Sequence, residues 1–280
     1  MPTLETAGSQ LWYERAGDGP SVLVLQGVGL IGEGWRPQID GLADRFRLFA
    51  PDNRGIGRST IRNDRLTIDD MAADALAIMD AEKCDRFHVV GHSMGGVIAQ
   101  ALALSAPARV LSLSFLCTFA RGKDGAAMSL PMLITALRMR IGSRRMRRNA
   151  FLELIMPARY LGQVDRVALA EQLRPLFGHD LAEQPSIVFA QLRAMSTYDA
   201  RPRLGELGHI PTLVMSASED RVAAPANGRA LAGYIPGARY IEIADAGHGV
   251  TIHRATEINA LLAEHFATAA PTEPRFRPPR

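Results

Sequence analysis

Residues 86–104 restrict the possible folds of this chain more than any other stretch. Apolar residues 87–90 predict a buried strand that ends at Gly91, and a small, apolar helical pattern begins at Gly95. Ser93 lies at the corner between them, which gives the pattern G-x-S-x-G. A turn this sharp needs strained backbone angles at its corner and neighbours with almost no side chain. It presents the Ser93 hydroxyl at the positive end of the following helix, although a serine that simply caps a helix is the plainer interpretation.

Strands and helices alternate over most of the chain, which predicts a mostly parallel sheet with helices on both faces. Continuous apolar runs such as residues 21–25 are typical of its buried central strands. We expect helices at 35–42, 68–79 and 252–266. We expect strands at 3–7, 10–15, 21–25, 46–50, 87–90, 110–117, 211–215 and 239–243.

Residues 121–200 interrupt this alternation because they contain no convincing strand. They predict helices near 128–141, 143–156, 164–174 and 185–198, separated by Gly142, Pro157, Pro175 and Pro185. Such an insertion would cover the carboxyl ends of the strands, where open α/β sheets bind ligands. We therefore expect a core of residues 1–120 and 201–270, a helical cap of residues 121–200, and a disordered tail of residues 271–280.

Composition narrows the class of protein further. Hydrophobic residues are 47% and charged residues 22% of the chain, as in soluble globular proteins. The sequence has no signal-peptide pattern and no apolar run of the roughly 18 residues that a membrane span needs, so we expect a cytoplasmic protein. Cys84 and Cys117 have no metal-ligand spacing and predict buried thiols rather than a disulfide framework. We expect no metal and no cofactor.

The basic residues are concentrated in one place. The formal net charge is only +3, but six arginines cluster in the expected cap. No aromatic and basic interleaving supports nucleic-acid binding. The cluster spans the helix junction at Gly142, which suggests cap carboxylates or an anionic membrane surface as partners, with a solvated face as the alternative. Its members are Arg138, Arg140, Arg144, Arg145, Arg147 and Arg148.

The corner sequence G-H-S-M-G-G resembles the nucleophile elbow of the α/β-hydrolase family. The resemblance implies an eight-stranded sheet, with the cap inserted after the sixth strand, and a catalytic order of serine, acid and histidine. His248, in Ala-Gly-His before the last helix, matches the family's base. Asp220 follows strand 211–215 and matches the family's acid, with Glu219 and Asp245 as alternatives.

The resemblance also implies an oxyanion hole, made by the backbone amides of Met94 and Val28. Gln26 stands where the family commonly has histidine, and we expect it to support this loop and to contact substrate. Met132 and Leu133 of the expected cap are further substrate-binding candidates. The turn at residues 52–59 matches the family's D-x-R-G-x-G-x-S, in which we expect Arg54 to bond loop carbonyls.

Residues 27–32 also spell G-x-G-x-x-G after a strand, with Asp52 about twenty residues later, which is the dinucleotide-binding pattern. Gly34 and Pro37 delay the helix that this pattern needs, and two strands precede the unit. The hydrolase resemblance instead interprets these glycines as a loop that passes close to Ser93.

Taken together, the motifs predict a serine hydrolase that cleaves an apolar carboxylic ester or lactone through an acyl-Ser93 intermediate. Residues 91–104 are similar to 3-oxoadipate enol-lactonases and related esterases. Carbon–carbon bond hydrolases and cofactor-free haloperoxidases or perhydrolases share the same signature and stay open as alternatives. A ligand-binding protein without catalysis is the alternative outside this class, since fold does not fix function.

Overall fold

The computed structural model describes residues 2–62, 66–125 and 130–269. The expected tail at residues 271–280 lies outside these ranges. Within the described ranges, every helix is too short or too polar to cross a membrane.

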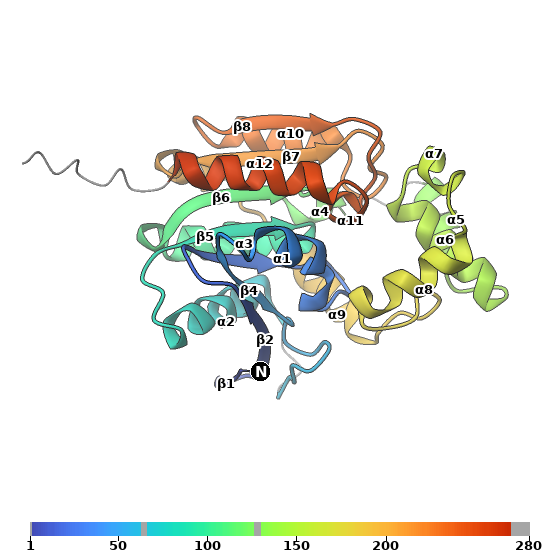
Figure 1. Cartoon of the computed structure of the whole chain (residues 1–280), viewed down its shortest axis with the longest axis horizontal. Coiled ribbons are helices and arrows are strands. Elements are labelled where there is room, and N and C mark those ends of the chain that lie inside the picture. The colour runs from blue at the N-terminus through green and yellow to red at the C-terminus, as the bar shows by residue number, and fades with distance from the viewer. Residues whose placement is uncertain (1, 63–65, 126–129, 270–280) are drawn as a thin grey trace, which may run out of the picture.

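An eight-stranded sheet forms the centre of the molecule, with the strand order β1-β2-β4-β3-β5-β6-β7-β8 (Figure 1). β2 pairs antiparallel with β1 and β4, and all other pairs are parallel, which confirms the predicted mostly parallel sheet. The central strands β3 and β5 are buried along their whole length. The strands are β1 (Thr3–Glu5), β2 (Gln10–Ala16), β3 (Ser21–Leu25), β4 (Arg47–Pro51), β5 (Phe87–His92), β6 (Val110–Leu116), β7 (Thr212–Ala217) and β8 (Arg239–Ile243).

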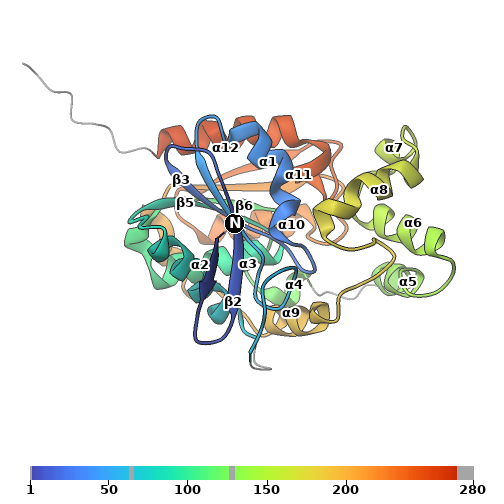
Figure 2. The ribbon, with the colours of Figure 1, turned by 60° about the horizontal axis from the view of Figure 1, so that its bottom comes forward.

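Helices cover both faces of this sheet (Figure 2). α1 (Arg36–Leu42), after the 3₁₀ turn Gly32–Trp35, packs beside α12 (Ala255–Thr268) on one face. α2 (Ile68–Ala81) packs beside α3 (Met94–Ser105) on the other, and α3 is apolar all round because it is buried.

The ends of the core helices follow ordinary helix chemistry. Thr67 caps α2 by accepting a hydrogen bond from the Asp70 amide. The expected last helix is divided into α11 (Val250–His253) and α12. α10 (Pro225–Tyr234) lies where no helix was expected, although Pro225 at its first position is a common helix start.

Within the described residues, the α-helices between β6 and β7 form the cap, and most of them lie at one end of the molecule (Figures 1 and 2). The cap has a small core of its own around Leu152, Leu173 and Phe177. Pro175 does not separate two helices as expected but lies inside α8, near its C-terminal end. The cap helices are α4 (Gly122–Gly125), α5 (Leu130–Arg138), α6 (Arg144–Ile155), α7 (Ala158–Leu161), α8 (Arg166–Phe177) and α9 (Ile187–Ser196).

Carboxylates of the cap pair with half of the arginine cluster. Asp180 accepts hydrogen bonds from Arg144 and Arg148, and Arg148 also lies 2.6 Å from Glu171. The hydrogen bonds from Arg148 hold the pKa of Asp180 well below its usual range. Arg138 lies 2.9 Å from a Glu153 oxygen. Of the two partners suggested by the sequence, cap carboxylates therefore account for three of the six arginines.

Candidate active site

Ser93 occupies a strained turn between β5 and α3, with φ 54° and ψ −120°. A Cβ atom at Gly91 would lie 2.4 Å from the Gly95 carbonyl oxygen, and one at Gly95 would lie 2.0 Å from the Leu25 oxygen. Both glycines are thus required by close backbone packing. A 2.7 Å hydrogen bond from the Thr118 hydroxyl to the Ser93 carbonyl helps to stabilise this strained backbone conformation.

An acid and a base come together from two loops at the same edge of the sheet. Asp220 follows β7, and His248 follows β8. His248 Nδ1 lies 2.8 Å from Asp220 Oδ2, and the amides of Val222 and Ala223 donate to Asp220 Oδ1 at 2.7 and 2.8 Å. The alternatives Glu219 and Asp245 are both exposed, and neither hydrogen-bonds His248.

Asp220 is arranged to stay ionised. Burial alone would raise its pKa, but the charge of His248, the hydrogen bond to it and the two backbone amides bring that pKa below its usual value. The ionised carboxylate of Asp220 accepts a hydrogen bond from the Nδ1–H group of His248. This tautomer leaves the Nε2 lone pair of His248 available as a base.

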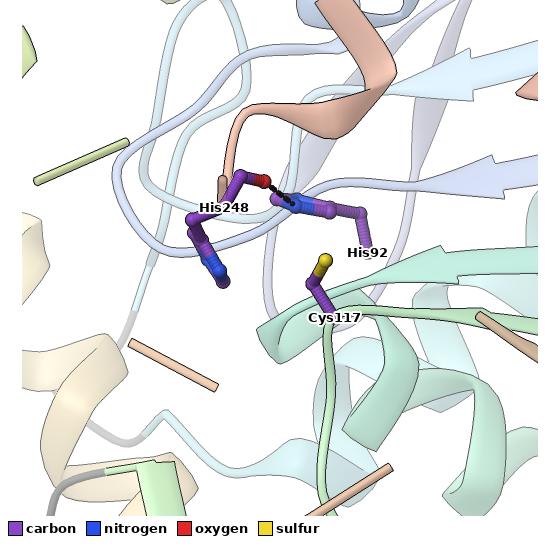
Figure 3. Close-up of side chains that lie close together, drawn as sticks. All are labelled: His92, Cys117 and His248. Carbon is purple, nitrogen blue, oxygen red and sulfur yellow. Dashed lines mark hydrogen bonds between the residues drawn. The ribbon is translucent and has the colours of Figure 1, made fainter. Parts of the chain in front are cut away.

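His92 and Cys117 lie beside His248 (Figure 3). His92 Nε2–H donates to the His248 carbonyl at 2.8 Å, and burial, followed by the charge of His248, lowers the pKa of His92 to about 3. Burial and the Asp220 carboxylate raise the pKa of the Cys117 thiol well above its usual value. The three side chains in Figure 3 lie close enough to share a metal ion. The raised pKa of Cys117 favours its protonated thiol, which is a poor metal ligand, and His248 Nδ1 is already paired with Asp220.

The glycine-rich loop after β3 passes directly over Ser93. A Cβ at Gly27 would lie 3.1 Å from Ser93 Cβ, which agrees with a loop built to approach Ser93 rather than a dinucleotide. Asp52 is likewise structural, because its buried carboxylate accepts from the amides of Gly32 at 2.7 Å and Arg58 at 2.9 Å. The Val28 and Met94 amides make no hydrogen bond to another group in the part of the chain that the structure describes.

The cap holds this loop in place through Gly29, whose φ is +75°. Gln191 of α9 accepts a 2.8 Å hydrogen bond from the Gly29 amide, and His179 Nε2 lies 3.1 Å from the Gly29 carbonyl oxygen. By contrast, the Gln26 side chain hydrogen-bonds only the next residue among those that the structure describes, since its Oε1 accepts from the Gly27 amide at 3.2 Å. Nothing in the local sequence signals Gln191, which lies 162 residues from Gly29 along the chain.

Two of the expected contacts differ in the structure. The Arg54 guanidinium forms a two-pronged ion pair with Asp74 of α2, at 2.6 and 2.7 Å, and bonds one helix carbonyl rather than loop carbonyls. Leu133 is wrong as a substrate contact, because its side chain is 53% exposed and does not line the cavity. The neighbouring Met132 does line it, since adjacent residues of a helix point about 100° apart.

A cavity of about 370 Å³ lies between the cap and the sheet, with Ser93 and His248 in its wall. Among the described residues, no aspartate, glutamate, lysine or arginine lines it. Gln26 and Met132 both line it, as expected for substrate-binding residues. Its volume lies within the range of small-molecule sites. Most of the wall is apolar, and the cap contributes Met139, Phe151, Leu154, Phe177, Val188, Leu192 and Met195 to it.

Comparison with known proteins agrees with this geometry. The family model for the alpha/beta hydrolase fold matches residues 20–254. The chain belongs to the alpha/beta hydrolase family. A protein named "Putative carbamate hydrolase RutD" from Azorhizobium caulinodans is 29% identical over 262 residues, covering 94% of this chain and 97% of its own length.

Two solved members of the family have closely similar folds. The enol-lactonase from Burkholderia xenovorans LB400 has a TM-score of 0.78 at 28% identity, covering 95% of this chain and all of its own. Est816, described as an N-acyl homoserine lactone degrading enzyme, has a TM-score of 0.78 at 29% identity, covering 94% of this chain and 99% of its own. The family and these relatives make the chain a hydrolase.

Proposed function

We propose that this alpha/beta hydrolase cleaves uncharged, apolar carboxylic esters or lactones through an acyl-Ser93 intermediate. The observation that carries the proposal is the cavity, which holds Ser93 and His248 but no charged side chain among its described lining residues. A carboxylate or ammonium group on the substrate would lose its hydration there without gaining a partner. A small polar substrate such as a carbamate would leave much of the apolar wall unfilled.

The first half of the reaction acylates the serine. His248 Nε2 takes the Ser93 hydroxyl proton as the oxygen attacks the substrate carbonyl carbon. The amides of Val28 and Met94 donate to the oxyanion of the tetrahedral intermediate. The intermediate collapses when the carbon–oxygen bond to the alcohol breaks and the alkoxide takes the proton from His248.

The second half restores the enzyme. A water molecule gives its proton to His248 Nε2 and attacks the acyl carbon, and the ester bond to Ser93 then breaks as its oxygen regains the proton. Asp220 keeps the ring oriented and stabilises its positive charge in both halves. A lactone follows the same steps, except that its alcohol stays attached to the acyl chain.

The test combines a fluorophosphonate probe with a substrate panel. We expect labelling of the wild type and of Ser105→Ala, an exposed serine at the end of α3, but not of Ser93→Ala. We expect kcat/KM to rise up to about fifteenfold for each two carbons added to a neutral p-nitrophenyl ester, up to about eight carbons, because each buried methylene contributes about 0.8 kcal/mol. Labelling that persists in Ser93→Ala would overturn the nucleophile, and a preference for charged substrates would overturn the substrate class.

The cap wall supplies a matched pair of variants. Met132→Ala should reduce the preference for longer esters, because it removes an apolar side chain against which the longer acyl chains would be buried. Leu133→Ala, one residue away on the exposed side of α5, should leave the preference unchanged. Equal chain-length profiles in Met132→Ala and the wild type would mean that α5 does not contact the acyl chain.

A further inference from the structure

The outer side of the cap displays a group of large apolar side chains. Its five members are between 51% and 62% exposed, and we name them together the cap face: Leu133, Ile134, Leu137, Ile141 and Met146. The first four follow one side of α5 and the helical turn after it, where the Ile141 amide still bonds the Leu137 carbonyl. Met146 adjoins them because its side chain packs on Gly142. A Cβ atom added to Gly142 would lie 3.1 Å from Met146 Cε. Contiguous exposed apolar groups of this kind mark interaction surfaces.

The surroundings of the cap face are strongly basic. Residues 125–152 contain six arginines and no acidic residue. Arg140 and Arg145 are exposed, and neither has an ion-pair partner among the residues that the structure describes. The Arg140 guanidinium lies 4.8 Å from the centre of the Phe189 ring, which is itself 58% exposed.

The cap face and the cavity wall lie on opposite sides of the same helix. The inner side of α5 and the turn after it contribute Met132, Ala136 and Met139 to the cavity wall, so this helix is apolar on both sides. Leu192 of α9 both lines the cavity and is 39% exposed. α5 and α6 lie at the outer end of the cap, away from the sheet (Figures 1 and 2). α5 therefore separates the cap face from the cavity by the thickness of one helix.

We propose that the cap face docks on the surface of an anionic lipid membrane. Its apolar side chains would enter the boundary between head groups and acyl chains, while Arg140 and Arg145 contact lipid phosphates. A second copy of this chain fits less well, because a two-fold contact would bring the same arginines of both copies together. Docking would bring the cap, whose inner side lines the cavity, next to a phase in which apolar molecules dissolve. It concerns binding alone and does not depend on the proposed reaction.

The experiment is co-sedimentation of the whole chain with vesicles. At low salt, we expect binding to vesicles of 30% phosphatidylglycerol in phosphatidylcholine and at least tenfold weaker binding to pure phosphatidylcholine. Arg140→Gln with Arg145→Gln should weaken binding about 25-fold, because each arginine near an anionic surface contributes about fivefold. Leu137→Ser with Ile141→Ser should weaken it about tenfold or more.

Matched controls separate the cap face from a general charge effect. Arg45→Gln with Arg86→Gln removes two exposed arginines of the core, and Val167→Ser removes an exposed apolar side chain of α8 outside the cap face. Both should bind like the wild type. No binding to the anionic vesicles, or equal losses in the control and cap-face variants, would overturn the proposal. A dimer in sedimentation velocity that Leu137→Ser with Ile141→Ser abolishes would overturn it in favour of a second copy.

Discussion

Replacing Gln191 by methionine tests whether the cap positions the oxyanion hole. Gln191 is fully buried, and its Oε1 accepts the Gly29 amide at 2.8 Å, one residue beyond Val28. Methionine has nearly the length of glutamine but no comparable acceptor. The variant therefore removes one hydrogen bond from the loop and keeps most of the packing.

The structure sets the size of the expected effect. A buried amide that loses its acceptor costs about 1–3 kcal/mol, which the loop can relieve by moving Gly29. Such movement displaces the Val28 amide, and complete loss of an oxyanion donor costs about 2.7–4 kcal/mol in a characterised protease. Partial displacement should raise the acylation barrier by about 1–2 kcal/mol, which is a 5- to 30-fold slower reaction. KM should change little, because Gln191 does not line the cavity.

The assay is single-turnover acylation with p-nitrophenyl butyrate, beside thermal unfolding. Gln172→Met, which changes an exposed glutamine of α8, is the matched control and should equal the wild type in both. A lower Tm in Gln191→Met with an unchanged acylation rate would refute the link between the cap and the oxyanion hole. So would a rise in KM that accounts for the whole loss of kcat/KM.

Three further predictions concern other groups of the site. Asp220→Asn should lower kcat at least 100-fold with little change in KM, because the His248 tautomer is no longer fixed; Asp245→Asn, an exposed control, should have normal kinetics. Gln26→Ala should raise the acylation barrier by roughly 1–2 kcal/mol if the hydrogen bond from the Gly27 amide to Gln26 supports the loop. Equal rates for this variant and the wild type in single-turnover assays would show that it does not. Burial lowers the pKa of His88 to about 4 and that of His92 to about 3, so the unfolded chain binds more protons than the folded chain below pH 6.5. The stability that these neutral histidines contribute is therefore present above pH 6.5 and is lost as the pH falls, which lowers the free energy of unfolding by about 2 kcal/mol per histidine at pH 5. Equal free energies of unfolding in urea at pH 7 and pH 5 would contradict this.

The core could be predicted from the sequence because its signals are local. A buried parallel strand is a run of adjacent apolar residues, and the Ser93 turn needs glycines only two residues away on each side. His248 and Asp220 were found by their positions after strands, since parallel strands bring their carboxyl ends to one edge. α10 was missed because its ten residues include two glycines and little apolar periodicity.

The side-chain contacts of the cap could not be predicted from the sequence, for a different physical reason. Its helices could be placed from their apolar patterns, but the rotation of each helix is decided by what it packs against. Met132 and Leu133 are both large and apolar, and only the position of the cavity makes one a lining residue and the other a surface residue. The same holds for Arg54, whose partner Asp74 lies on α2, and for Gln191.

The cap connects binding and chemistry through one helix. α9 carries Val188 and Leu192, which line the cavity, and Gln191, which bonds the oxyanion loop. Any outward movement of α9 that widens the cavity also stretches the Gln191–Gly29 bond, because a 2.8 Å hydrogen bond tolerates only a few tenths of an ångström. We therefore expect the proposed oxyanion donor Val28 to depend on the position of α9, through the Gln191–Gly29 bond, as well as on the loop that carries it.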